Sequence, residues 1–168
     1  MACGGSEVQP RPQVSESPAS VSRAGPAKVT EVAEKCAVLD EQELRGFGVD
    51  QPPRERDVSG MWGCEYQGTS DDDQVWSAAV ALNGHVSYKA ELNRRAEPTG
   101  SSDLKGYPGK TFRNGMDCTL IADISDRGFL VANGTKVTPG DRGPDPCVIA
   151  EQLGGMAVLN LPDEPAAG

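Results

Sequence analysis

Hydrophobic and polar residues alternate in the middle of the chain, and this period of two predicts antiparallel β-strands. Residues 74–82, QVWSAAVAL, and residues 85–92, HVSYKAEL, each place every second side chain on one apolar face. Asn83 and Gly84 lie between the two runs, and this dipeptide favours the type I′ turn of a β-hairpin. The pattern therefore predicts a first hairpin that turns at Asn83 and Gly84.

A second hairpin is predicted over residues 117–135, where DCTLIADIS is followed by the turn DRG and by FLVANGT. The inward-facing positions of its first strand are Cys118, Leu120, Ala122 and Ile124. A shorter apolar run at residues 60–67, GMWGCEYQ, adds a fifth strand.

Helical signals precede the sheet. Four apolar residues recur at helical spacing around Thr30, a favoured N-cap residue. They are Val29, Val32, Ala33 and Cys36. Asp40 and Glu43 have the capping-box pattern of a second helical turn, which is predicted to end at Gly46. Residues 51–57, QPPRERD, are predicted to form a loop because proline cannot continue a helix.

A C-terminal helix is predicted after Asp145, a good N-cap residue, with Pro146 in its first turn. Its apolar stripe consists of Cys147, Ala150, Leu153 and Ala157. Gly154 and Gly155 weaken its middle, and Pro162 stops it. The element order predicts an α+β fold, an antiparallel sheet of about five strands with the N- and C-terminal helices packed on one face.

The chain divides into three predicted parts. Residues 1–28 are rich in Ser, Pro, Gly and Ala and lack apolar periodicity, which predicts a disordered tether. An ordered N-terminal arm is the alternative. Residues 29–162 form a single domain, and residues 163–168 form a disordered tail.

Residues 94–116 form the longest predicted loop and concentrate positive charge in a chain of net charge -9. The candidate binding residues are Arg94, Arg95, Lys105, Tyr107, Lys110 and Arg113. Loops held by a rigid scaffold are common recognition sites. The alternative is a solvated connection whose Tyr107 packs against the sheet edge.

Charge and residue content narrow the function classes. The net charge of -9 repels nucleic-acid phosphates, so we expect no nucleic-acid partner. A hydrolase triad needs a histidine base, and His85 is the one histidine of the chain. Residues 71–73, DDD, lack the spaced ligands and glycine of a calcium loop. We therefore expect no catalytic residue, no metal and no other cofactor.

Four of the five cysteines lie on predicted helices or strands, and four cysteines allow three disulfide connectivities. The sequential one pairs Cys36 with Cys64 and Cys118 with Cys147. It is favoured because each bond joins a terminal helix to a neighbouring strand. Two disulfides imply an oxidising compartment. Four reduced, buried cysteines in a cytosolic protein are the alternative.

Cys3 lies in the predicted tether, where a free thiol would be reactive. Residues 2–6, ACGGS, match the end of a bacterial lipobox and the start of a mature lipoprotein. We predict that Cys3 carries a thioether-linked diacylglycerol, and that trimming or a misplaced start codon accounts for the missing signal segment. A chance cysteine beside the initiator is the alternative.

Over residues 35–162 the chain resembles a family of actinobacterial lipoproteins that carry a domain of unknown function, to which the mycobacterial LprB and LprC lipoproteins belong. The residues that carry the resemblance are Cys36 before Leu39 and Leu44, Gly63 with Cys64, residues 106–109 (GYPG), Cys118, and residues 145–147 (DPC) before Ala150. It implies an exported, membrane-anchored, disulfide-bonded α+β domain and no catalytic activity. The absent signal segment and the pair Gly154 and Gly155 depart from the family pattern.

These observations predict a lipid-anchored, extracytoplasmic protein of the cell envelope whose domain binds an envelope protein or a small ligand without catalysis. We expect a monomer that meets the membrane through the lipid on Cys3. A small extracytoplasmic hydrolase and a purely structural envelope protein are the alternatives.

Overall fold

The computed structural model describes residues 22–166, so Cys3 and most of the predicted tether lie outside the described residues. One antiparallel sheet has the strand order β1-β2-β3-β7-β6-β5-β4. The strands are β1 Arg54–Val58, β2 Met61–Thr69, β3 Val75–Asn83, β4 Gly100–Asp103, β5 Pro108–Asn114, β6 Asp117–Asp123 and β7 Phe129–Lys136. The helical elements are the 3₁₀ turn η1 Lys35–Ala37 and the α-helices α1 Glu41–Phe47, α2 Tyr88–Asn93 and α3 Pro146–Asn160. The α+β class is confirmed, and the predicted number of strands was too low.

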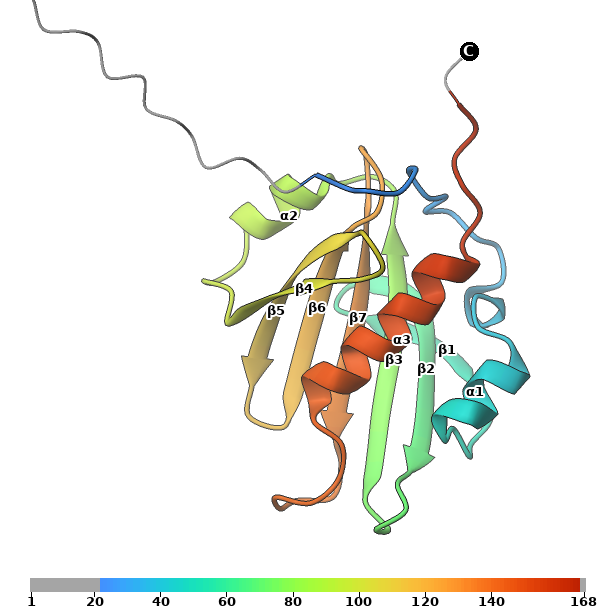
Figure 1. Cartoon of the computed structure of the whole chain (residues 1–168), viewed down its shortest axis with the longest axis vertical. Coiled ribbons are helices and arrows are strands. Elements are labelled where there is room, and N and C mark those ends of the chain that lie inside the picture. Colours follow the sequence, from blue (N-terminus) through green and yellow to red (C-terminus); the bar gives the residue numbers. More distant parts are fainter. Residues whose placement is uncertain (1–21, 167–168) are drawn as a thin grey trace, which may run out of the picture.

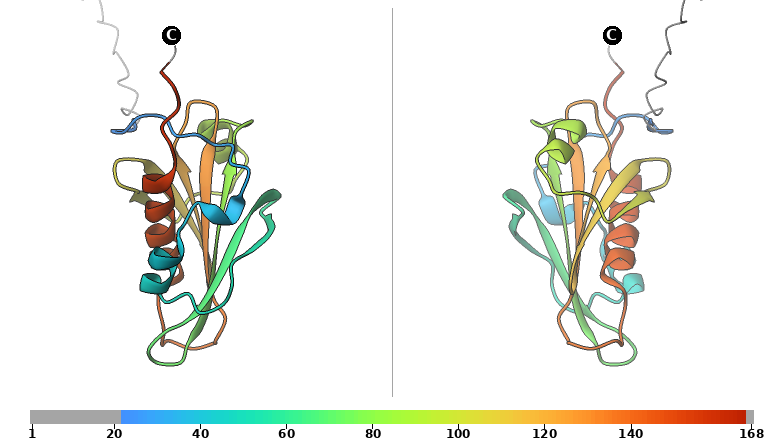
Figure 2. Two further views of the ribbon diagram at one scale, coloured as in Figure 1. Left: turned by 90° about the vertical axis from the view of Figure 1, so that its right-hand side faces the viewer. Right: turned by 90° about the vertical axis from the view of Figure 1, so that its left-hand side faces the viewer.

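Helices cover both faces of this sheet. α1 and α3 lie on one face and α2 lies on the other (Figures 1 and 2). Leu44 of α1 and Leu153 of α3 belong to the main core cluster. Helices α1 and α3 therefore pack on the same face of the sheet. Tyr88 of α2 packs on the opposite face against a smaller cluster that contains Phe129 and Val131.

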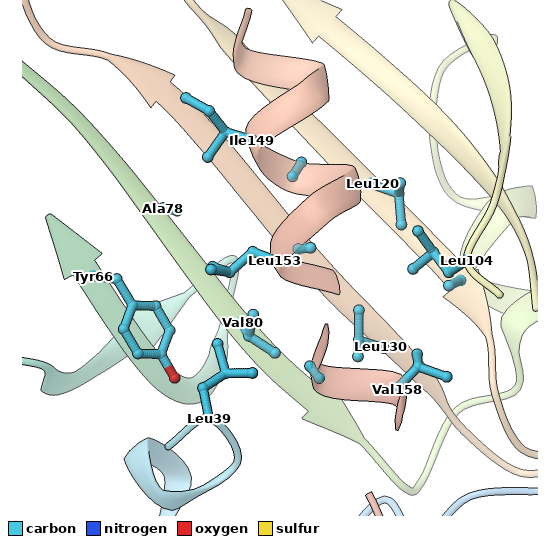
Figure 3. Packing of buried hydrophobic residues seen from close by; sticks show 14 of the residues in the cluster. Leu39, Tyr66, Ala78, Val80, Leu104, Leu120, Leu130, Ile149, Leu153 and Val158 are labelled. Atoms are coloured by element: carbon cyan, nitrogen blue, oxygen red, sulfur yellow. The ribbon is translucent and has the colours of Figure 1, made fainter. Parts of the chain in front are cut away.

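The main core lies between α3 and the sheet. Ile149, Leu153 and Val158 of α3 point toward side chains of β3, β6 and β7 (Figure 3), and all three are buried. Gly154 lets the helix approach β7 closely, because a Cβ added there would lie 3.2 Å from the Cβ of Ala132. Large side chains at Ile149, Leu153 and Val158 and a glycine at position 154 thus allow α3 to pack closely on the sheet.

The predicted partner strand of β3 does not form. Asn83 Oδ1 accepts the backbone N–H groups of His85 and Val86, at 2.9 Å each, and this turn leads the chain out of the sheet. Ser87 Oγ then accepts the N–H of Ala90 at 3.2 Å and caps α2. β3 pairs with β2 and β7 instead, so both of its edges are occupied.

The outer strands of the sheet were predicted as loops. Residues 51–57 contain most of β1, and residues 94–116 contain β4 and β5. The first four residues of β1 are exposed at the sheet edge. β5 buries Gly109 and Thr111, which are small or polar. These strands lack the alternation of large apolar and polar residues on which the prediction depended.

The helix predicted over residues 29–36 is also absent, apart from η1. Lys28 forms an isolated antiparallel bridge with Asp163, and the N–H of Val29 donates to the carbonyl of Pro162 at 2.9 Å. The start of this segment, at Lys28 and Val29, therefore lies beside the residues that follow α3 instead of starting a helix.

Residues 23–28, which the sequence assigned to the tether, contact the folded domain. Arg23 forms an ion pair with Asp123. The Tyr107 hydroxyl donates to the carbonyl of Pro26 at 2.7 Å. The ordered domain therefore begins before the predicted boundary.

The two disulfides have the sequential pairing that the sequence analysis favoured. Cys36 is joined to Cys64 and Cys118 to Cys147, with sequence separations of 28 and 29 residues. The first bond ties η1 to β2, and the second ties the first turn of α3 to β6.

Candidate binding groove

A groove of about 1020 Å³ lies on the face of the molecule that carries α1 and α3. We call it the α1–α3 groove. Its walls come from the end of α1, the β2–β3 turn, the outer side of α3 and the β4–β5 turn. Its apolar lining residues are Phe47, Trp76, Leu104, Pro144, Ile149, Met156 and Leu159. This size and lining are typical of small-molecule or peptide sites.

The end of α1 places an aromatic side chain at the groove. Asp40 and Glu43 form the predicted capping box at its start. The helix ends at Phe47, because Gly48 adopts the left-handed conformation with φ 94°, rather than at Gly46. The capped helix therefore holds Phe47 beside β3.

Phe47 meets Trp76 of β3 edge to face, with ring centroids 5.1 Å apart and an interplanar angle of 76°. Trp76 is only 3 % exposed. Gly68 of β2 makes room for this arrangement, since a Cβ there would lie 2.4 Å from Trp76 Cζ2 and 2.3 Å from the carbonyl oxygen of Gly48. The aromatic floor of the groove thus depends on a glycine in the neighbouring strand.

Gly155 of α3 is itself buried, but it borders the open space of the groove. A Cβ added to Gly155 would meet no atom within 4 Å, in contrast to one on Gly154. Leu159, one helical turn further along, is 62 % exposed, and Val148 is 45 % exposed. The outer surface of α3 therefore combines exposed apolar side chains with a notch.

Charges of both signs surround the groove. Its cations are Arg45 and Lys105, and its carboxylates are Asp71, Asp103 and Glu151. Arg45 lies 3.7 Å from Glu41 in an exposed i,i+4 pair, which contributes little. In the β4–β5 turn, Asp103 accepts the N–H of Gly106 at 2.7 Å. The groove is therefore apolar inside and close to neutral at its rim.

A sequence model of DUF3558, described as a protein of unknown function, matches residues 1–160. The chain belongs to the DUF3558 family. No curated protein and no solved structure matches the chain. The domain of unknown function that the resemblance implied is therefore confirmed. Within residues 22–166 no helix is long and apolar enough to span a membrane.

The basic residues predicted to form a binding loop are dispersed. Arg94 and Arg95 both bind the carboxylate of Glu91. Burial alone would raise the pKa of Glu91, but the hydrogen bonds from the two arginines outweigh it and leave the pKa below its ordinary value. Lys110 donates to Ser101 at 2.8 Å. Arg94 and Arg95 thus neutralise Glu91, and Lys110 bonds to a neighbouring strand. The three side chains do not form one site.

The other members of that set have separate roles. Tyr107 is buried in the main core, and its hydroxyl donates to the carbonyl of Pro26, as in the alternative in which Tyr107 packs against the domain. Its turn is tight, and its side chain packs inward with Leu104. Arg113 forms an ion pair with Asp145 at the start of α3. Lys105 is the member that lines the α1–α3 groove.

His85 and the acidic run at residues 71–73, which were considered for catalysis and metal binding, do not form a common site. The side chain of His85 is 82 % exposed, and its Nε2 lies 3.7 Å from Glu31. Of the acidic run at residues 71–73, Asp71 lines the groove. Among residues 22–166 there is no cluster of three or more His, Cys, Asp or Glu side chains that could hold a metal ion.

The principal groove residues were not predicted as a site. Phe47 and Trp76 come from elements far apart in the sequence, and Trp76 was assigned only to an inward face. One signal was present, because Val148 and Leu159 lie outside the predicted stripe of the C-terminal helix and make that helix apolar on both sides.

Proposed function

We propose that this DUF3558 protein is an exported, lipid-anchored protein of the cell envelope, of the actinobacterial lipoprotein type, whose domain binds a partner through the α1–α3 groove without catalysing a reaction. The observation that carries the binding role is the groove itself, with its aromatic floor and the exposed apolar side of α3.

Export is supported by the two disulfides. Each closes a loop of 28 or 29 residues and ties a helical element to the sheet. Disulfides of this structural kind form and persist in oxidising compartments outside the cytoplasm. The family match and the disulfides together support an extracytoplasmic domain.

Lipid anchoring rests on residues 2–6, ACGGS, and on the resemblance to the LprB and LprC lipoproteins. A diacylglyceryl cysteine would hold an acidic domain at a membrane surface that its net charge of -9 does not favour. The strap of residues 23–28, fixed by Arg23 and Tyr107, would then connect the anchor to the domain.

A binding role is favoured over hydrolysis by the composition of the groove. Its rim offers two cations and three carboxylates around an apolar floor, and its lining contains no histidine, cysteine or tyrosine. A general base and an activated nucleophile must lie within hydrogen-bond reach of each other. The hydroxyl of Ser70 in this lining donates to the carboxylate of Asp72 in the β2–β3 turn, and no histidine of the lining lies beside it as a general base.

The anchor is tested in the natural host with the full upstream sequence. We expect the wild type in the membrane fraction, with an intact mass that includes the lipid on Cys3. Cys3→Ser should be released or remain an unprocessed precursor. If both proteins fractionate alike and Cys3 is unmodified, the anchoring proposal is wrong.

The groove is tested in the same cells with a photo-crosslinking residue in place of Leu159. Val137, which is 50 % exposed and outside the groove, is the matched control position. We expect a defined crosslinked species from position 159 and none from position 137. Equal labelling at both positions, or none at either, would contradict a binding role for the groove.

A further inference from the structure

Helix α3 carries apolar residues on two opposite sides and is covered on one. Glu151 and Gln152 are the polar residues of its outer side. Its inner side, which includes Ala150, Leu153 and Ala157, is fully buried against the sheet. Its outer side exposes Val148 and Leu159. A surface helix of a globular domain usually carries polar residues on its solvent side, and a helix that is apolar all round is usually buried all round. The outer side therefore exposes more apolar surface than an ordinary solvent-facing side, and it mixes apolar with polar residues as protein interfaces do.

This outer side contains both halves of a complementary contact. Leu159 projects into solvent, and Gly155 leaves an open space one helical turn away. Glycine is unfavourable inside a helix relative to alanine. Alanine would meet no neighbour at position 155. Surrounding side chains thus do not exclude a Cβ at position 155, and glycine there lets another chain approach the helix closely.

We infer that the α1–α3 groove is covered by a second copy of this chain, with the two α3 helices packed antiparallel about a two-fold axis. In that arrangement Leu159 of each copy fills the notch at Gly155 of its partner. A two-fold interface requires one patch to be complementary to itself, and a projection and a notch on the same helix satisfy this requirement.

The charge distribution agrees with self-association at this face. The chain has a net charge of -9, so two copies repel each other over most of their surface. The groove rim is close to neutral, with two cations and three carboxylates. Arg45 and Lys105 flank α3 from α1 and from the β4–β5 turn, which lie on opposite sides of the helix (Figure 1). Cations and carboxylates can therefore meet across the pair.

The inference rests on the proposed function only in taking the groove as the interaction surface. It proposes a dimer where the sequence analysis expected a monomer. The test is sedimentation equilibrium of the purified full chain, from micromolar to millimolar concentration. We expect a reversible dimer in the wild type. Leu159→Glu and Gly155→Leu should each weaken the dimer at least tenfold. Val137→Glu, an exposed substitution outside the groove, should leave the dissociation constant unchanged.

Circular dichroism melting shows whether each variant is folded, and the new Cβ of Gly155→Leu meets no neighbouring side chain within 4 Å. A wild type that stays monomeric up to millimolar concentration overturns the inference. The inference is also overturned if Leu159→Glu and Gly155→Leu leave the dimer intact and Val137→Glu weakens it. Crosslinking from position 159 to a different protein would contradict the dimer and leave the proposed binding role standing. The absence of any crosslink there contradicts that binding role itself.

Discussion

The inner and outer sides of α3 both carry leucine and glycine, but the inner side packs against the sheet and the outer side faces the groove. On the inner side, Leu153 is fully buried and Gly154 lies within 3.2 Å of the neighbouring strand, measured from an added Cβ to the Cβ of Ala132. On the outer side, Leu159 is exposed and Gly155 faces open space. Leucine and glycine therefore have one role in the core of the domain and another at the α1–α3 groove. Residue type alone does not distinguish the two roles.

The largest effect is expected where the inner side is tied to the sheet. Replacing Cys118 and Cys147 together by alanine removes a disulfide with a sequence separation of 29 residues. Loop-closure entropy predicts a loss of about 3–4 kcal/mol in the free energy of unfolding. Urea denaturation monitored by circular dichroism measures it. Val148→Ala, at the adjacent but exposed residue, should stay within about 0.5 kcal/mol of the wild type.

The two leucines of α3 provide the next comparison. Leu153→Ala leaves a cavity in a fully buried position and should cost about 3 kcal/mol, within the range of about 2–5 kcal/mol for such changes. Leu159→Ala removes an exposed side chain and should change the stability of the monomer by less than about 0.5 kcal/mol. Similar losses for both would show that the outer side is packed in solution, and denaturation at two protein concentrations would then identify the dimer.

The sequence predicted the inner side of α3 better than the outer side. Asp145, Pro146 and the stripe through Leu153 are local signals, because capping and helical periodicity involve residues close in the chain. β2, β3, β6 and β7 were predicted for the same reason, since their apolar positions alternate. The sequential disulfide pairing followed from the order of these elements.

The elements that the sequence did not predict, β1, β4, β5, α2 and the groove, depend on contacts with residues far away in the chain. β1 and β4 are edge strands, and β5 buries Gly109 and Thr111 instead of large apolar residues. α2 was assigned to a strand because Val86 and Tyr88 fit a period of two, whereas Ser87 acts as a helix cap. The groove depends on Phe47 and Trp76 meeting across the fold, which only the tertiary structure provides.

A smaller effect is expected at the start of α3, where Asp145 caps the helix and binds Arg113. The hydrogen bond from Arg113 holds the pKa of Asp145 below its ordinary value. The stabilisation is therefore complete above the ordinary carboxyl pKa and is lost as the pH falls through the lower pKa of the folded state. Asp145→Ala should cost about 1 kcal/mol at neutral pH.

Denaturation as a function of pH measures this dependence. The difference between the wild type and Asp145→Ala should shrink once Asp145 becomes protonated. Asp145→Asn keeps a capping oxygen and loses the ion pair, so its stability should lie between the other two. A penalty for Asp145→Ala that does not change with pH would show that the ionised carboxylate contributes nothing beyond the cap.

The smallest effect compares the two adjacent glycines directly. Gly155→Ala removes the helix penalty of glycine, and the new methyl group meets no neighbour within 4 Å. It should stabilise the monomer by about 0.5–1 kcal/mol. Gly154→Ala gains the same helix propensity, but its methyl group lies 3.0 Å from Leu104 Cδ1 and 3.2 Å from the Cβ of Ala132. This crowding in a fully packed interior should place its melting temperature below that of the wild type.

Both variants are measured by thermal melting at a concentration low enough to keep the protein monomeric. For a domain of this size, the gain from Gly155→Ala corresponds to a rise of about 1–4 °C in melting temperature. A rise for both variants would mean that the inner side tolerates a methyl group and that the close approach of α3 to β7 does not require glycine. A fall for Gly155→Ala would mean that the notch is already filled from within the chain, which would remove the space that the second copy needs.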